Sequence, residues 1–179
     1  MQPSTDPFEI LGISPTFDVD LKACEARHRE LSRAAHPDKF RDASPAERKR
    51  ATDIAASANE AWRALRDPIK RAEILFERRG VGVGEGNEPK AAPAFLMTML
   101  EKREALAEAR AQNDRAAVER LKVEIEAMQA ESMGELSHAF HEGGAAALEA
   151  AVPHLGKLRF YRRYIEDVSA IEDEFDGIA

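Results

Sequence analysis

Apolar residues recur at helical intervals through the first 79 residues of the chain. Between Leu21 and Ala35 they fall at steps of three and four, which is the period of one helix face. Similar segments follow Pro7, Pro45 and Pro68, and an Asp or Ser that can cap a helix precedes each of these prolines. The pattern predicts a small unit of four helices, from about residue 6 to residue 79. Its predicted core residues are Leu21, Cys24, His28, Leu31, Ala35, Ile54, Ala58, Ala61, Trp62, Leu65, Ile69, Ala72, Leu75 and Phe76.

The helical period returns after residue 93 and predicts three further helices. The first runs from Ala94 to about Ala111, the second ends at Gly143, and the third continues to Val168. Pro153 predicts a kink or a break in the third helix, because proline lacks the N–H that a helix needs. Amphipathic helices with short joints favour an antiparallel three-helix bundle. Its predicted core residues are Phe95, Met99, Leu106, Val118, Leu121, Ile125, Met128, Leu136, Phe140, Leu148, Val152, Leu158, Tyr161, Ile165 and Val168.

Between the two helical regions lies the sequence GVGVGEGNEPKAAP. Its glycines are not spaced like those of a phosphate-binding loop, and no strand is predicted before them. We therefore expect a flexible or turn-rich connector. The sequence predicts an all-α protein with a first domain at residues 1–79, a linker at 80–93 and a C-terminal three-helix bundle at 94–179.

Charge is distributed unevenly along the chain. The net charge is −7, and residues 94–179 carry 17 acidic and 10 basic side chains, whereas residues 1–93 carry 16 of each. This balance argues against nucleic acid as a partner and suggests that the two regions bind different partners. We expect neither a membrane span, which needs an apolar run of roughly 20 residues, nor a secretory signal in the opening MQPSTDPF. Cys24 is the single cysteine, which excludes an internal disulfide and a thiolate metal cage and fits a reducing cytoplasm.

A basic stripe on the second helix leads to the tripeptide His36-Pro37-Asp38. Lys22, Arg29 and Arg33 share the helix face opposite the predicted core. The proline stops the helix, so the imidazole and the carboxylate are left at a bend, where functional groups tend to occur. Stripe and bend together predict a docking surface for an acidic partner, with the carboxylate reaching one basic group there. A merely solvated helix face is the alternative, and Glu30 on the flank of the stripe keeps that alternative open.

Two segments around this bend, HRELSRAAHPDKF (His28–Phe40) and NEAWRALRDPIKRAE (Asn59–Glu73), together with the order of the helices, resemble a J domain. This is the module by which DnaJ-type co-chaperones drive ATP hydrolysis by DnaK-type chaperones. The chain departs from the family at Ala35, where an aromatic residue is common, and at His28, where tyrosine is frequent. The resemblance implies chaperone-binding residues at Lys22, Arg29, Arg33, His36, Pro37, Asp38 and Lys39.

Two further segments, AFLMTMLEKREAL (Ala94–Leu106) and KLRFYRRYIEDV (Lys157–Val168), extend the resemblance to the HscB family of iron–sulfur cluster biogenesis. It implies a co-chaperone of the bacterial cytoplasm that stimulates the ATPase of a specialised DnaK-type chaperone. It also implies that the C-terminal bundle carries the client, the scaffold protein on which the cluster is first built. We expect no catalytic residue, cofactor, metal, nucleic acid or membrane partner. Eukaryotic relatives add a tetracysteine metal domain, which a chain with one cysteine lacks.

The predicted bundle has more apolar positions than its core needs. Leu96, Met97 and Leu100 lie well away from the core side of the first helix, and Phe160 lies off the core stripe of the last. Scattered exposed hydrophobic residues, or cover by the linker, are the ordinary alternative. By resemblance, the scaffold-binding positions of the family fall on Leu96, Met97, Leu100, Glu101, Arg103, Glu104 and Phe160.

Two alternative functions remain at this point. Glu25-x-x-His28 and Glu135-x-x-His138, with His141 one turn later, match the spacing of di-iron helical bundles, although such spacing arises often by chance in a Glu-rich chain. A nucleophilic role for Cys24 is disfavoured by its place on a core face. The other alternative is a J-domain co-chaperone with a different client.

Overall fold

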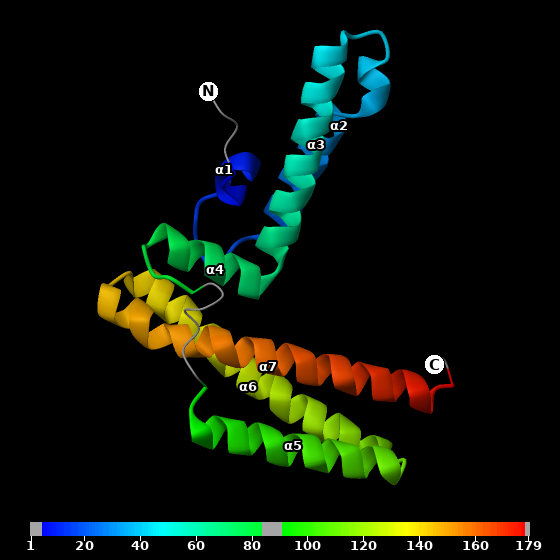
Figure 1. Cartoon of the computed structure of the whole chain (residues 1–179), viewed down its shortest axis with the longest axis vertical. Coiled ribbons are helices and arrows are strands. Elements are labelled where there is room, and N and C mark those ends of the chain that lie inside the picture. Colours follow the sequence, from blue (N-terminus) through cyan, green and yellow to red (C-terminus); the bar gives the residue numbers. More distant parts are fainter. Residues whose placement is uncertain (1–4, 84–90, 178–179) are drawn as a thin grey trace. The chain divides into compact units, whose positions relative to one another are not determined.

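The protein consists of helices in both of its parts, as predicted (Figure 1). The structure, a computed structural model, describes residues 5–83 and 91–177. It divides into two compact units, Met1–Arg78 and Arg79–Ala179. Much of the predicted linker, residues 84–90, lies outside the described residues, and the last residue of the linker already belongs to a helix. Across the described ranges, no helix is both long and apolar enough to cross a bilayer.

The N-terminal unit contains α1 (Pro7–Leu11), α2 (Leu21–Ala34), the short 3₁₀ helix η1 (Pro37–Phe40), α3 (Pro45–Arg66) and α4 (Pro68–Arg78). α2 and α3 form a long hairpin, and α1 lies beside the C-terminal half of α3 (Figure 1). The predicted capping box begins α3: the Ser44 hydroxyl accepts a hydrogen bond from the Glu47 N–H, and the Glu47 carboxylate accepts one from the Ser44 N–H at 2.9 Å. The helix starts of this unit were thus predictable from local sequence.

The core of this unit lies where α1 and α4 join the hairpin. Phe8, Cys24, Leu65 and Phe76 are fully buried there. The prediction that Leu21 and Ile54 belong to the core is wrong, since both are exposed, and Trp62 is only half-buried. Ile54 lies in the N-terminal half of α3, away from α1 and α4, which complete the core around the other half (Figure 1), so too few helices surround its side chain to bury it. Leu21 is the first residue of α2, so it lies at the end of this helix that is farther from the turn into α3.

A buried arginine joins the end of α3 to α4. Arg71 is only 6% exposed, and its Nη1 donates a hydrogen bond to the carbonyl oxygen of Leu65 at 2.5 Å. Its guanidinium also lies over the ring of Phe17, 5.1 Å from the ring centre. Burial lowers the pKa of Arg71. Sequence periodicity did not single out this residue, because a charged side chain is read as a surface position.

The C-terminal unit is the predicted antiparallel bundle of α5 (Pro93–Ala111), α6 (Arg115–Glu142) and α7 (Ala145–Phe175). α6 and α7 lie side by side over most of their length, and α5 packs against the pair (Figure 1). The Asp114 side chain caps α6 by accepting from the N–H of Ala117 at 2.9 Å. Gly143 ends α6 in the left-handed conformation, with φ of 74°.

Pro153 does not break the last helix. α7 is continuous from Ala145 to Phe175 with the proline inside it. Leu148 and Ala151 before the proline, and Leu155 and Leu158 after it, are all buried. Packing on both sides therefore holds the helix together where its own hydrogen-bond ladder lacks a donor.

Tyr164 takes the core position that the sequence assigned to Ile165. Tyr164 is fully buried, whereas Ile165 is half-buried. The Tyr164 hydroxyl donates to the carbonyl oxygen of Lys102 at 3.0 Å, so it connects α7 to the middle of α5. Burial raises the pKa of Tyr164 to about 12. The predicted core residues Leu121, Met128 and Val152 are likewise half-buried.

A polar contact lies within the α6–α7 interface, one residue after the proline. His154 Nδ1 is 3.3 Å from the hydroxyl of Ser132, which is 2% exposed. Burial and the neighbouring charge of Lys157 lower the pKa of His154 from 6.5, against smaller opposite effects of Glu135 and Glu131. The folded unit therefore favours the neutral imidazole.

We expect acid to destabilise the C-terminal unit through His154. Above the unfolded pKa the imidazole is neutral in both states, and below it the unfolded chain takes up the proton more readily, so stability is lost as pH falls from about 7 to about 5. Relative to His154→Gln, the wild type should lose unfolding free energy over this range. Tyrosine absorbance during urea unfolding reports this unit, since the chain's two tyrosines, Tyr161 and Tyr164, both lie in α7. Equal pH dependence of the two proteins would contradict the assignment.

Candidate partner-binding surfaces

The sequence around Pro37 forms an exposed tip at the end of the α2–α3 hairpin. A residue before proline is disfavoured in the helical region, and His36 is accordingly extended, with φ of −63° and ψ of 132°. α2 therefore ends at Ala34, and η1 begins at the proline. The His36 ring accepts a hydrogen bond at Nδ1 from the N–H of Asp38 at 3.3 Å. The side chains of this tip, all exposed, are His36, Pro37, Asp38 and Lys39.

Among the residues that the structure describes, the partners of the tip carboxylate are themselves exposed. Asp38 accepts a hydrogen bond from Arg41 at 3.1 Å, and its second oxygen lies 3.6 Å from His36 Nδ1. Exposed ion pairs of this kind contribute little to stability. Asp38 can therefore exchange Arg41 for a cation on a partner at small cost.

The basic stripe of α2 is exposed along its length, as predicted. Lys22, Arg29 and Arg33 all face solvent. Arg29 forms an ion pair with Glu25, and Arg33 donates from Nε to the Arg29 carbonyl oxygen at 3.3 Å. These short-range contacts hold the cations along the helix surface and leave them accessible.

Two side chains flank the stripe without belonging to it. Arg27 donates from Nε to the carbonyl oxygen of Leu11 at 3.3 Å and pairs with Glu30 at 2.5 Å. Glu30, which favoured the alternative of a merely solvated face, is therefore paired with Arg27 and not with an arginine of the stripe. The spacing of the stripe did not reveal Arg27, which fixes α2 to the end of α1.

The histidines of the two Glu-x-x-His pairs contact other side chains. His28 Nε2 lies 2.7 Å from the side-chain oxygen of Asn59 on α3, and its ring stacks on Trp62, while Glu25 binds Arg29. On α6, His138 lies 3.7 Å from Glu142. Among the described residues no group of three or more His, Cys, Asp or Glu side chains could hold a metal ion. Cys24 is buried, and burial raises the pKa of its thiol.

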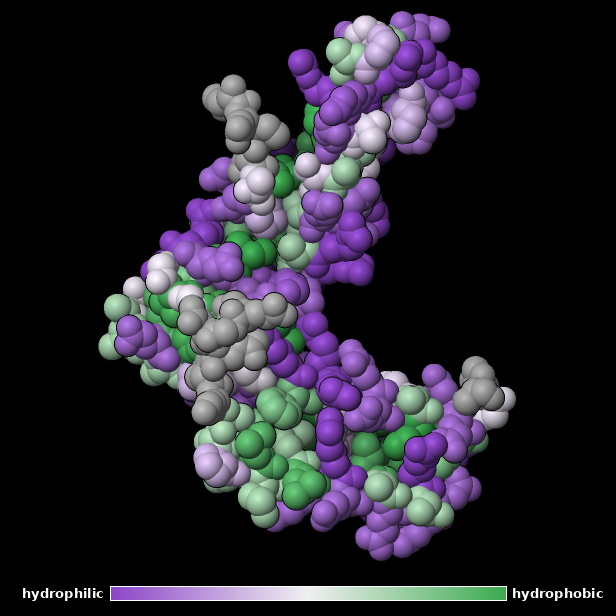
Figure 2. Space-filling model, viewed as in Figure 1, coloured by the Kyte–Doolittle hydropathy of each residue, from purple (hydrophilic) through white to green (hydrophobic). Residues whose placement is uncertain are grey.

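A patch of exposed apolar side chains covers the start of α5. Figure 2 shows hydrophobic surface gathered over this part of the bundle. Leu96, Met97 and Leu100 are 43%, 57% and 50% exposed, and Phe160 of α7 is 37% exposed. We call these four residues the apolar patch. Their exposure is as predicted, and an exposed group of this kind typically marks an interaction site.

Phe95 supports the apolar patch from below. The sequence predicted Phe95 as a core residue, but its side chain is only half-buried. Its ring meets Phe160 edge to face at 5.4 Å between centroids and Tyr161 at 5.7 Å. Phe160 is therefore partly a packing residue, which explains why it is the least exposed member of the patch.

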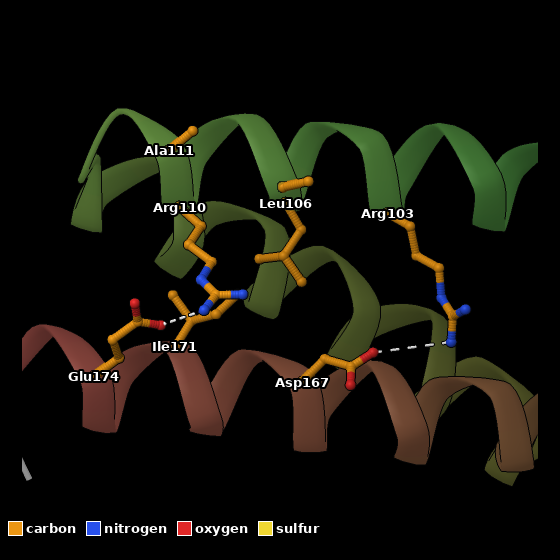
Figure 3. A pocket seen from close by; sticks show the side chains of 8 residues that line it. Arg103, Leu106, Arg110, Ala111, Asp167, Ile171 and Glu174 are labelled. Carbon is orange, nitrogen blue, oxygen red and sulfur yellow. Dashed lines mark ion pairs between the residues drawn. The ribbon is translucent and has the colours of Figure 1, made fainter. Parts of the chain in front are cut away.

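Charged side chains lie beside the apolar patch on α5. Glu101, Arg103 and Glu104 are all exposed, as their predicted role requires. Arg103 forms an ion pair with Asp167 of α7 at 3.8 Å. About two helical turns further along α5, Arg110 pairs with Glu174 at 2.8 Å (Figure 3). These two pairs lie on a hollow of about 540 Å³ between α5 and α7, which sequence patterns did not predict.

Comparison with known proteins supplies the family. Residues 91–169 match the model of the HSCB C-terminal oligomerisation domain family. A co-chaperone protein HscB homolog of Ralstonia nicotianae is 37% identical over 169 residues, covering 94% of this chain and 95% of that protein. The chain belongs to the HscB co-chaperone family. A second HscB homolog, from Burkholderia multivorans, is 34% identical over 91% of each chain.

Solved HscB structures share this architecture. Chaperone HscB from Vibrio cholerae superposes with a TM-score of 0.82 at 30% identity, covering 95% of this chain and 99% of that one. The human co-chaperone protein HscB gives a TM-score of 0.85 at 26% identity, covering 96% and 84%. The family predicted from the tripeptide and the two α5 and α7 segments is confirmed, and so is the fold of a J domain followed by a helical bundle.

We expect the apolar patch to be dispensable for folding. Leu96→Ala, Met97→Ala and Leu100→Ala together should change the unfolding free energy of the C-terminal unit by about 1 kcal/mol or less, because exposed substitutions have small effects. Met99→Ala on the same helix is the control: Met99 is 3% exposed, and its truncation should cost about 2–5 kcal/mol. Urea unfolding followed by tyrosine absorbance compares the two. A triple variant as unstable as Met99→Ala would place the patch in the core.

Proposed function

We propose that this HscB-family protein stimulates ATP hydrolysis by a specialised DnaK-type chaperone and brings it the scaffold protein of iron–sulfur cluster assembly. The observation that carries the first half is the exposed His36-Pro37-Asp38 tip beside an exposed basic stripe. The apolar patch on a separate unit supports the second half. The protein itself would act as a regulator, with ATP bound and hydrolysed by its partner. We place this activity in the bacterial cytoplasm, consistent with a single buried, unpaired cysteine.

Docking on the chaperone is proposed to begin with the stripe. Lys22, Arg29 and Arg33 present positive charge along one exposed face, so an acidic chaperone surface would be steered toward α2. The tip would then meet the chaperone, where Asp38 exchanges Arg41 for a basic group of the partner. Lys39 adds a further cation to the same surface.

Client capture is proposed to use the C-terminal unit. Leu96, Met97 and Leu100 would enter the interface as apolar anchors, while Glu101, Arg103 and Glu104 provide a polar rim. Methionine suits such a surface because its side chain adapts to irregular partners. With the two partners on separate units, this protein can hold client and chaperone at the same time.

Asp38→Asn tests the chaperone half of the proposal. The amide is nearly isosteric, and Asp38 is exposed, so Trp62 fluorescence and thermal melting should match the wild type. Stimulation of the partner ATPase should be lost, because the charge needed for the contact is gone. Arg41→Gln is the matched control: it removes the internal partner of Asp38 and should retain stimulation. Normal stimulation by Asp38→Asn would refute the docking role.

Leu96→Ala with Leu100→Ala tests the client half. Central apolar anchors typically cost about 2 kcal/mol each when truncated, so affinity for the purified scaffold protein should fall by at least tenfold. ATPase stimulation without scaffold should stay at the wild-type level, since the J domain is untouched. Calorimetric titration with the scaffold measures the affinity. Retained affinity would leave a J-domain co-chaperone with a different client surface.

A further inference from the structure

A hollow of about 640 Å³ lies next to the apolar patch in the C-terminal unit. The start of α5 forms one wall, and the stretch of α7 from Val152 to Phe160 forms the other. Leu96 and Phe160 belong to both the hollow and the apolar patch, so the two surfaces are continuous. Most of its lining is apolar, and the larger apolar residues in it include Val83, Phe95, Leu96, Val152, Leu155 and Phe160.

The wall from α7 contains two residues that weaken helices. Pro153 and Gly156 both line the hollow and both lie in the interior of α7. Proline removes a backbone donor, and glycine has the lowest helix propensity after proline. A Cβ built on Gly156 would meet no heavy atom within 4 Å outside its own helix backbone. Close packing therefore does not require glycine at this position, and its missing side chain deepens the hollow.

The charged residues of the hollow are basic. Lys157 and Arg159 line it, and none of the described lining residues is acidic. This contrasts with residues 94–179 as a whole, where acidic side chains outnumber basic ones by 17 to 10. The Lys157 ammonium lies 6.0 Å from the centre of the Phe95 ring, so the cation stands directly over the apolar lining. The other large hollow, at Arg103 and Arg110, differs in its lining because it contains the acidic residues Asp167 and Glu174 as well.

We propose that this hollow is an anchor pocket for the client: it receives a segment of the scaffold protein that carries bulky apolar side chains next to a carboxylate. The apolar side chains fill the space over Gly156, and the carboxylate binds Lys157 at the rim. This inference rests on the proposed client role of the C-terminal unit. It adds to that role a recessed site, formed mainly by α7, with a defined charge preference.

Filling the pocket tests its use directly. Gly156→Leu should occupy the hollow and lower scaffold affinity at least tenfold in calorimetric titration, while ATPase stimulation without scaffold stays unchanged. Helix stability should not fall, because leucine favours helix over glycine. Gly134→Leu is the matched control, since Gly134 lies within α6, has equally open space around it and does not line the pocket. It should bind scaffold like the wild type.

A second pair of variants tests the charge preference. Lys157→Glu should weaken scaffold binding about tenfold and reduce its dependence on salt, because a carboxylate would then face a carboxylate. Arg120→Glu makes the same charge change at an exposed position of α6 outside the pocket, and it should leave binding unchanged. Equal effects of the two reversals would show a general charge effect and refute the rim contact.

The outcomes separate this inference from the proposed function. If Gly156→Leu binds scaffold normally while Leu96→Ala with Leu100→Ala does not, the anchor pocket is refuted and the apolar patch stands. If neither weakens binding, the client role itself fails. If Gly156→Leu instead abolishes self-association in sedimentation and leaves scaffold affinity intact, the occupant is a second copy and the proposal is overturned. Gly156→Ala guards against misfolding of the larger variant and should give a smaller loss of affinity in the same direction.

Discussion

Proline at the first position of a helix is the constraint on which this fold depends. α1, η1, α3, α4 and α5 all begin with one. The residue before each of these prolines has a ψ between 114° and 156°. A proline cannot continue a helix from the preceding residue, but its fixed φ suits the first turn of the next. Each proline therefore turns the chain and starts a helix in one step. At Pro37 the same rule leaves the side chains of the hairpin tip, residues 36–39, exposed.

Pro153 is the exception, because it lies inside a helix, and it shows that the buried and exposed faces of α7 differ in composition. The buried face carries Leu148, Ala151 and Leu158, whose packing keeps the helix continuous. The face toward the hollow carries Pro153 and Gly156, which contribute nothing to helix formation. The same division is found in α2, where the buried Cys24 and the exposed stripe lie on different faces. The proposed partner contacts would thus form on faces that the core does not use.

Local sequence predicted the helices well and their packing less well. Caps such as Ser44 act through neighbouring residues, so helix starts could be found without the fold. Ile54 lies on the apolar face of α3, but the periodicity of one helix does not show how many neighbours cover it. Arg71 and Tyr164 were missed for a related reason, since a buried polar group is recognisable only once its distant acceptor, Leu65 or Lys102, is known. The tripeptide and the apolar patch could be predicted without knowing the fold. Apolar residues beyond those that a core needs, and charged residues at a bend, are expected to be exposed. The recessed pocket depends on two helices together and could not be predicted from either.

The two methionines at the start of α5 differ in their exposure to oxidants. Met97 is 57% exposed in the apolar patch, whereas Met99, two residues away, is 3% exposed in the core. Oxidation converts the thioether into a polar sulfoxide, which is reversible by methionine sulfoxide reductases. Peroxide in solution would therefore modify Met97 before the buried Met99. With Met97 in the proposed client interface, oxidation would weaken client binding and reduction of the sulfoxide would restore it, while the core methionine keeps the bundle folded.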